Sequence, residues 1–239
     1  MSAEEIQKNV REIRERILVA AAKAGRRAEE ITLIGVSKTH SAVAIREAFG
    51  AGVRHFGENR VQEWEGKRAG VSDLSQAELG ARWHLVGHLQ SNKAARAAKM
   101  FHSVDSVDDF ALAQKLDRAR VDAEGQGKLR VLVEVRVAAE ETKSGIEREQ
   151  LPELAERIVR LERLELAGLM CIPPFLEDAE KVRPYFEQLR ELKEQLEKRL
   201  GRSLPVLSMG MSSDFEVAIE EGATEVRIGT AVFGAREKP

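Results

Sequence analysis

The chain has 239 residues, 43% of them apolar and 33% charged, with a formal net charge of −2 at pH 7. This balance of charge excludes a general nucleic-acid binder, and no apolar run is long enough to cross a bilayer. The length suits one α/β barrel of roughly 250 residues, so we expect a single domain over residues 1–239. The lone cysteine, Cys171, cannot form an internal disulfide and is expected to be a buried, inert thiol. Together with an N-terminus that lacks a signal-peptide layout, it predicts a cytoplasmic protein.

The first predicted element is a helix that precedes any strand. Ser2 and Glu5 form a capping-box pattern, and apolar residues recur at helical spacing up to Gly25. Short apolar runs of strand length follow along the rest of the chain. The strands are predicted at residues 31–37, 53–57, 83–87, 101–104, 129–137, 164–170, 204–208 and 225–229.

Helical patterns lie between the predicted strands. Ser106 with Asp109 and Ser213 with Glu216 form two more capping boxes, and Pro152 is tolerated in the first turn of its helix. The helices are predicted at residues 2–25, 42–49, 58–67, 92–99, 106–123, 149–161, 178–200 and 213–222, with a short turn at 231–235. The polar stretches predicted to be loops are 69–80 and 138–145.

This alternation of strands and helices predicts the fold. It favours a parallel sheet with right-handed crossovers, closed into a (β/α)8 TIM-type barrel, with the first helix as an N-terminal addition. The alternative is an open Rossmann-like sheet. Residues 37–40, after the first strand, contain no glycine, which disfavours that alternative because its nucleotide-binding turn is glycine-rich.

A single lysine ends the first predicted strand. Lys38 follows an apolar run, so a barrel would place its amine at the mouth, where the carboxyl ends of the strands meet. Partial loss of solvation there lowers the pKa of an amine, and a neutral amine attacks an aldehyde to form a Schiff base. The alternative is an ordinary surface lysine, one of 38 Lys and Arg residues in the chain.

The loops after the seventh and eighth predicted strands favour an anion site. Glycines and hydroxyl side chains stand together in Ser208-Met209-Gly210-Met211-Ser212-Ser213 and in Arg227-Ile228-Gly229-Thr230. Glycine lets the backbone approach an anion closely, and helix N-termini present N–H groups. Either loop alone is better explained by helix capping, but as neighbours in a closed barrel they predict a phosphate site beside Lys38. That combination suits pyridoxal 5′-phosphate (PLP) or a phosphosugar aldolase.

Other polar residues carry weaker signals. His84 and His88 are four residues apart, about 13 Å along a strand, which is too far to share one metal ion. His55 and His102 are expected to be satisfied core or interface histidines. The loop with Lys143-Ser144-Gly145 is either a lid with an anion-attracting lysine or a solvated loop.

Several motifs occur in order along nearly the whole chain. They are Gly35-Val36-Ser37-Lys38-Thr39, Phe56-Gly57-Glu58-Asn59, residues 83–93, Lys143-Ser144-Gly145, Leu207-Ser208-Met209-Gly210-Met211-Ser212 and Arg227-Ile228-Gly229-Thr230. In this combination the chain resembles the pyridoxal phosphate homeostasis proteins, the YggS/PROSC family. That family is similar to the barrel domain of alanine racemase, a fold-type III arrangement.

The resemblance implies roles for particular residues. Lys38 would hold PLP as an internal aldimine, Asn59 would lie near the ring hydroxyl, and Arg227 near the pyridine nitrogen. An always-charged guanidinium there disfavours protonation of that nitrogen and weakens the ring as an electron sink. The residues implied to contact the phosphate are Ser208, Ser212, Gly229 and Thr230. The full set of predicted cofactor-binding residues is Lys38, Asn59, Ser208, Met209, Gly210, Ser212, Arg227, Gly229 and Thr230, with no catalytic residue and no metal ligand.

The resemblance also implies a function, that of a PLP carrier and buffer in intracellular PLP homeostasis rather than an enzyme. A two-base racemase needs acids and bases on both faces of its substrate, and the only tyrosine, Tyr185, is predicted in the helix 178–200, away from the mouth. Two alternatives stay open: a fold-type III PLP enzyme such as an amino-acid racemase, and a Schiff-base phosphosugar aldolase. We expect a monomer whose partners are PLP and, as recipients, apo PLP-dependent enzymes, with no nucleic acid and no membrane.

Overall fold

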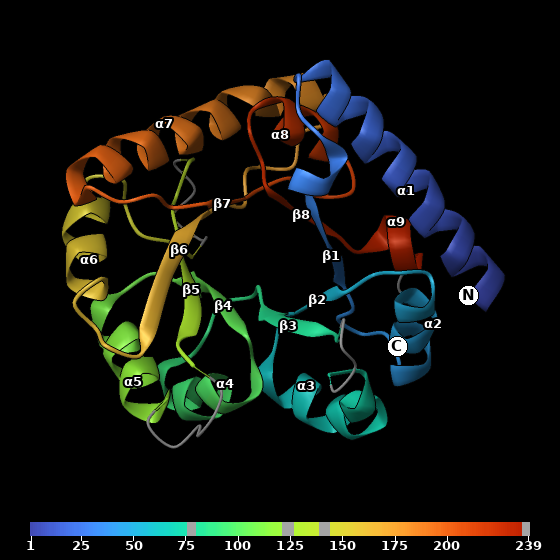
Figure 1. Ribbon diagram of the computed structural model, residues 1–239, viewed down its shortest axis with the longest axis horizontal. Coiled ribbons are helices and arrows are strands. Elements are labelled where there is room, and N and C mark those ends of the chain that lie inside the picture. The colour runs from blue at the N-terminus through green and yellow to red at the C-terminus, as the bar shows by residue number, and fades with distance from the viewer. Residues whose placement is uncertain (76–79, 121–126, 139–143, 236–239) are drawn as a thin grey trace.

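The computed structural model describes residues 1–75, 80–120, 127–138 and 144–235. Figure 1 shows them as a central ring of strands surrounded by helices. The strands are β1 (Thr32–Val36), β2 (His55–Glu58), β3 (Arg82–Leu85), β4 (Ser103–Val107), β5 (Leu129–Glu134), β6 (Leu164–Met170), β7 (Val206–Ser208) and β8 (Glu225–Ile228). They are parallel and form one closed barrel in sequence order, which confirms the predicted fold class.

Helices follow the strands and cover the outside of the barrel (Figure 1). The α-helices are α1 (Ala3–Lys23), α2 (Ala42–Gly50), α3 (Val61–Lys67), α4 (Ala94–Met100), α5 (Phe110–Arg120), α6 (Leu151–Ile158), α7 (Arg183–Leu200), α8 (Phe215–Glu220) and α9 (Thr230–Phe233). The 3-10 helices are η1 (Ala28–Glu30), η2 (Arg68–Ser75), η3 (Ser91–Lys93) and η4 (Ala179–Val182).

The barrel closes between its first and last strands. Gly35 of β1 lies opposite Phe56 of β2 on one side and opposite Ile228 of β8 on the other. Because the strands are parallel and in register here, the carboxyl ends of β1 and β8 open side by side at one mouth. An open Rossmann-like sheet, the alternative fold, is therefore excluded.

The predicted N-terminal helix packs across the closing seam of the barrel. The capping box at Ser2 and Glu5 is present, with each side chain bonded to the backbone of the other residue. The buried stripe of α1 packs against α2, α8 and α9, which Figure 1 shows beside it. The buried residues of this stripe are Ile6, Val10, Ile13, Ile17, Ala20 and Ala21.

Alternation along the strands separates two sets of side chains. Val131 and Val133 of β5 belong to the large hydrophobic core between strands and helices, whereas Leu132 belongs to a second, small cluster. Because successive strand residues point to opposite faces, Leu132 faces the barrel axis. The members of this second cluster are Leu132, Ala167, Met170 and Val206. Polar residues fill much of the remaining interior.

Two predicted capping boxes are wrong, because Ser106 and Ser213 do not occupy the positions directly before their helices. Ser106 belongs to β4, and the first turn of α5 is bonded by Asp109, whose Oδ1 accepts the N–H of Leu112 at 2.7 Å. Ser213 precedes the N-cap residue of α8, Asp214, whose side chain makes no capping hydrogen bond. In both places an aspartate, Asp109 or Asp214, stands closer to the start of the helix than the serine does.

The predicted loop at 69–80 is wrong in its first half. Arg68–Ser75 forms η2, because Val71 and Leu74 are buried at helical spacing. The remaining residues at 76–79, the predicted helix end at Ala123 and Lys143 lie outside the described residues. Among the residues that are described, no helix has the length and apolar character needed to span a bilayer.

Candidate functional site

Lys38 lies just beyond the carboxyl end of β1. The side chains of Ile34 and Val36 lie on the same side of β1, beside Gly57, and the period of two along the strand predicts that side for Lys38 as well. Lys38 itself is half-buried, while Ser37 before it is fully buried. Thr39 after it has φ of 66°, in the left-handed region that β-branched residues rarely adopt. A sharp backbone turn thus follows the lysine at the barrel mouth.

The loops after β7 and β8 meet each other at the barrel mouth. Gly210 has φ of 92°, and a Cβ there would stand 2.6 Å from Ala218 Cβ, so the loop after β7 requires glycine at this position. The Oγ1 of Thr230 lies 3.3 Å from the Oγ of Ser212, which joins the two loops. The predicted phosphate-loop residues Gly210, Ser212, Gly229 and Thr230 therefore lie in adjoining loops.

Contacts across the seam bring these loops to β1. A Cβ on Gly229 would stand 3.5 Å from the carbonyl oxygen of Val36, two residues before Lys38. The ring of His40 stacks on Phe233 of α9 with centroids 5.0 Å apart. The predicted juxtaposition of the first strand's end with the loop after the eighth strand is present in the fold.

Arg227 lies inside the barrel, below these loops. It is 4% exposed, and its guanidinium donates to the Oγ of Ser208 at 2.9 Å and to the carbonyl of Cys171 at 2.7 Å. These bonds fix the guanidinium from β6 and β7 at once. Ser208 is fully buried and contacts Arg227 rather than the hydroxyls of Ser212 and Thr230. Its place is therefore that of a partner to the arginine.

Met209 is less suited to ligand contact than the sequence predicts. Its side chain is fully buried in the main hydrophobic core, and its N–H donates to the carbonyl of Glu225 at 3.1 Å. The apolar environment on the helix-facing side of the barrel explains why a methionine stands between a buried serine and a glycine here.

Asn59 follows β2 and approaches the end of β3. It is half-buried, and its carbonyl oxygen lies so close to Gly87 that a Cβ there would stand 2.5 Å away. Gly87 therefore keeps space for the backbone of Asn59. Alternation from Gly57, which touches the interior side chain of Ile34, directs Asn59 toward the mouth.

Sequence reasoning missed a buried carboxyl group inside the barrel. Glu134 ends β5 and is 3% exposed; Ser144 donates to its Oε1 at 2.8 Å, while its Oε2 has no partner among the described residues. Burial raises the pKa of Glu134, and the nearby charge of Arg227 opposes this rise. The sequence held little signal for it, since Glu134 falls in the polar phase of the alternation in 129–137, together with Arg130 and Arg136, where a polar residue is ordinarily solvent-exposed.

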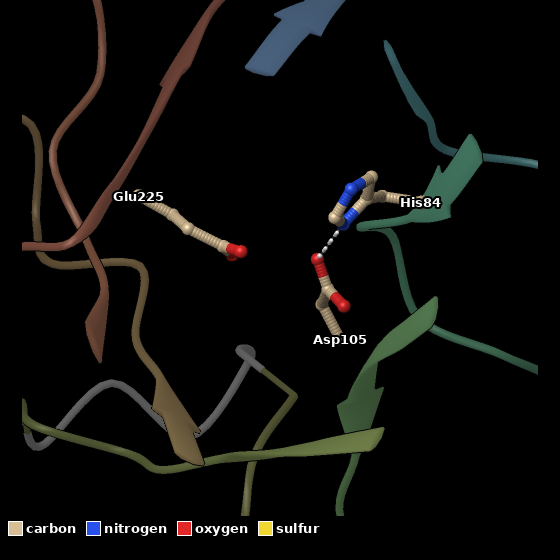
Figure 2. A group of neighbouring side chains, drawn as sticks. All are labelled: His84, Asp105 and Glu225. Carbon is tan, nitrogen blue, oxygen red and sulfur yellow. Dashed lines mark hydrogen bonds and ion pairs between the residues drawn. The ribbon is translucent and has the colours of Figure 1, made fainter. Parts of the chain in front are cut away.

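A second polar cluster lies inside the barrel, and Figure 2 shows its three residues pointing toward one another. The ligand atoms of His84, Asp105 and Glu225 lie within 4.8 Å of one another, the spacing of a possible metal site. Arg130, however, already donates to Glu225, so the protein supplies its own cation beside these carboxylates. We interpret the cluster as a buried hydrogen-bonded layer and assign no metal to it.

The histidine predictions can be compared with this layer. Nδ1 of His84 lies 3.0 Å from Oδ2 of Asp105, and Nε2 of His84 lies 2.9 Å from Nδ1 of His55. His55 therefore has a hydrogen-bond partner inside the barrel, as expected. His102 accepts the N–H of Trp83 at 3.1 Å. His88 is 54% exposed and lies 3.5 Å from Asp108, apart from the buried partners of His84.

Cys171 follows the expectation of an inert thiol. It is fully buried, and burial raises the pKa of its thiol to about 12. At that pKa the thiolate, which is the nucleophilic form, is scarce at neutral pH. Its contribution to the site is its backbone carbonyl, which accepts from Arg227.

Comparison with known proteins first defines the class. The family model of the alanine racemase N-terminal domain matches residues 2–237. Together with the closed barrel, this match makes the protein a (β/α)8 barrel of the alanine racemase N-terminal type.

Within that class, the chain belongs to the family of the pyridoxal phosphate homeostasis proteins. It is 45% identical over 223 residues to the family member from Aquifex aeolicus, covering 93% of this chain and 95% of the relative. It is 46% identical over 232 residues to the one from Pseudomonas aeruginosa, covering 97% and 96%. PipY of Synechococcus elongatus, solved with PLP bound, is 39% identical with a TM-score of 0.80, covering 93% of this chain and 100% of PipY. The predicted family is confirmed.

Proposed function

We propose that this protein holds PLP at the barrel mouth, as a Schiff base with Lys38, and acts in PLP homeostasis. The observation that carries the proposal is the adjacency of two strand ends. Lys38 follows β1, and the glycine and hydroxyl loops follow its neighbour β8 and β7. The bound PLP of the relative PipY supports the choice of cofactor.

The residues of the mouth fit such a group. Gly210, with φ of 92°, and Gly229 let the two loops pass close to α8 and β1, and Ser212 and Thr230 supply hydroxyl donors there. Arg227 offers a fixed guanidinium for the ring. The bound cofactor would supply an aldehyde, which condenses with the Lys38 amine and releases water.

The proposed set of binding residues differs slightly from the predicted one. Asn59 would lie beside the ring, and Ser208 would act by holding Arg227 in place. Met209 is left out, because its side chain is in the core and its N–H is bonded to Glu225. The proposed ligand contacts are Lys38, Asn59, Gly210, Ser212, Arg227, Gly229 and Thr230.

We further propose a carrier and buffer rather than a catalyst. The names of the relatives describe homeostasis of PLP, not a reaction. Tyr185, the only tyrosine, packs against the hydrophobic core from α7. The proposal includes a single domain, a monomer, a cytoplasmic location, and apo PLP-dependent enzymes as recipients of the cofactor.

A titration with PLP tests this function. The purified protein should develop a visible Schiff-base absorption band that Lys38→Ala loses and Lys8→Ala, at an exposed site on α1, retains. A band of equal strength in Lys38→Ala would contradict the assignment of the lysine. Turnover of single-enantiomer amino acids on chiral chromatography would favour a racemase. A sugar phosphate trapped by borohydride in colourless protein would favour an aldolase.

A further inference from the structure

Lys67 makes an unusually complete set of contacts for a lysine. It ends α3, its side chain is 10% exposed, and its ammonium lies near three oxygen atoms. These are the carbonyl of Ser37 at 2.8 Å, Oε1 of Glu58 at 2.8 Å and Oε1 of Glu63 at 2.9 Å. Since an ammonium has three N–H donors, this geometry uses all of them.

Glu58 joins this group to the side chain before Lys38. It is fully buried at the end of β2, and its Oε1 also accepts the hydroxyl of Ser37 at 2.6 Å. Burial raises the pKa of Glu58, and the charge of Lys67 opposes that rise. Lys67 is thus the counter-charge of a buried carboxyl group, a pairing that holds both side chains in one geometry.

Glu63 joins the group to the residue after Lys38. Its Oε1 accepts the N–H of Thr39 as well as the ammonium of Lys67. Thr39 has φ of 66°, a conformation that costs free energy and persists only where surrounding contacts hold it. The hydrogen bond from Thr39 to Glu63 is one such contact.

The same small network therefore holds the backbone on both sides of Lys38. Ser37 is bonded through its hydroxyl and its carbonyl, and Thr39 through its N–H. From these contacts we infer that Lys67, Glu58 and Glu63 are positioning residues, which fix the direction in which the Lys38 amine enters the barrel mouth. The inference rests on the proposed function, because PLP bound at the mouth is what supplies an aldehyde for the Lys38 amine to react with.

A lysine of the same kind elsewhere provides a matched control. Lys193 of α7 is 18% exposed and pairs with Glu197 at 3.2 Å with the same i,i+4 spacing. Lys67→Met should slow Schiff-base formation with PLP by about tenfold, because small misplacements of a reacting group are costly. Lys193→Met should leave the rate within about twofold of the wild type, because its ion pair joins two residues of α7 and does not hold the backbone beside Lys38.

A second measurement needs no cofactor. Trace labelling of the apoprotein with acetic anhydride across a pH series reports the reactivity and apparent pKa of Lys38. Lys67→Met should shift this labelling profile and Lys193→Met should not. A residue that only stabilises the fold would lower the melting temperature while leaving the profile of Lys38 unchanged.

A pair of substitutions at Glu63 covers the case in which Lys67→Met does not fold. Glu63 is 28% exposed, so its removal is tolerated more easily than that of Glu58. Glu63→Gln keeps an oxygen that can accept from Thr39 and Lys67, whereas Glu63→Ala keeps none. Slow Schiff-base formation in Glu63→Ala, restored in Glu63→Gln, is the expected result.

The inference can fail while the proposed function stands. If wild type forms the Schiff base and both Lys67→Met and Glu63→Ala match it in rate and labelling profile, the positioning role is overturned. If wild type forms no Schiff base at all, the proposed function fails first. The labelling profile of the apoprotein then still decides whether Lys67 orients Lys38.

Discussion

At the scale of single residues, Glu134 in the barrel interior is a carboxyl group whose charged form is unfavourable. Glu134 is 3% exposed, burial raises its pKa, and its Oε2 has no partner among the described residues. A folded-state pKa above the unfolded value means that the native state binds the proton more tightly. Ionisation of Glu134 therefore lowers the free energy of unfolding as the pH rises above the ordinary pKa of a glutamate.

Glu134→Gln should accordingly raise the free energy of unfolding at pH 8. The amide keeps an oxygen that can accept from Ser144 and removes the buried charge, which is worth about 1–3 kcal/mol. Urea denaturation at pH 5 and pH 8 measures the effect, and the gain should be larger at pH 8. A variant equally destabilised at both pH values would show that the carboxylate is compensated in the native state.

Single residues also show which positions could be predicted from the sequence and which could not. The positions of Lys38, Arg227 and the loop glycines at the ends of their strands could be predicted, because motifs and strand ends mark them, while their roles toward PLP stay predictions. Ser208 and Met209 could not be distinguished in advance, because which of two adjacent residues faces the barrel interior depends on the strand's exact register. Glu58 and Lys67 were missed because their pairing joins a strand to the next helix.

At the scale of elements, β6 and β7 come together around a glycine. Gly168 of β6 lies opposite Val206 of β7, and a Cβ on Gly168 would stand 1.9 Å from the carbonyl oxygen of Val206. Backbone cannot yield as a flexible side chain does, so any larger residue must separate the two strands. β7 also leads directly into the loop of Gly210 and Ser212.

Gly168→Ala should therefore destabilise the barrel by about 3 kcal/mol or more, in the range of severe overpacking. The control is Gly66→Ala in α3, where an added Cβ meets nothing within 4 Å. There alanine should stabilise the protein by roughly 0.5–1 kcal/mol through helix propensity and the unfolded-state entropy. Equal unfolding midpoints for the two variants would contradict the close approach of β6 and β7.

Elements were easier to predict than their ends. β6 was predicted with its observed bounds, and the helix ending at Leu200 stops where Gly201 adopts φ of 63°. The caps at Ser106 and Ser213 failed because a capping pattern in sequence does not tell which of several polar residues the chain's path brings to the helix start.

At the scale of the whole molecule, alternating strands and helices made the barrel predictable, but not how it shifts the pKa values of its partly buried histidines. His55 and His102 are both partly buried. The pKa of His55 is lowered to about 3 and that of His102 to about 4. Burial is the largest cause for both, followed by the charge of His84 for His55 and of Arg82 for His102. Both therefore stay neutral in the fold at mildly acidic pH.

The unfolded chain protonates the same histidines near pH 6.5, so it binds more protons than the folded chain below that pH. Stability should fall as pH is lowered from about 6.5 toward about 4, by at most about 1.4 kcal/mol per pH unit for each histidine. His102 contributes less, because solvent screens a partly exposed group. His102→Gln should flatten this dependence, and exposed His88→Gln should not. Urea denaturation between pH 7 and 4.5 measures it, and identical slopes for His102→Gln and wild type would contradict the depressed pKa.

The account depends most on the amine at the end of β1 being the one that meets the cofactor. Borohydride reduction of PLP-loaded protein, followed by mass spectrometry of its peptides, tests this directly. We predict a single reduced PLP adduct on Lys38, with none when Lys38 is replaced by alanine. An adduct on another lysine of the wild-type chain, with Lys38 unmodified, would contradict the account.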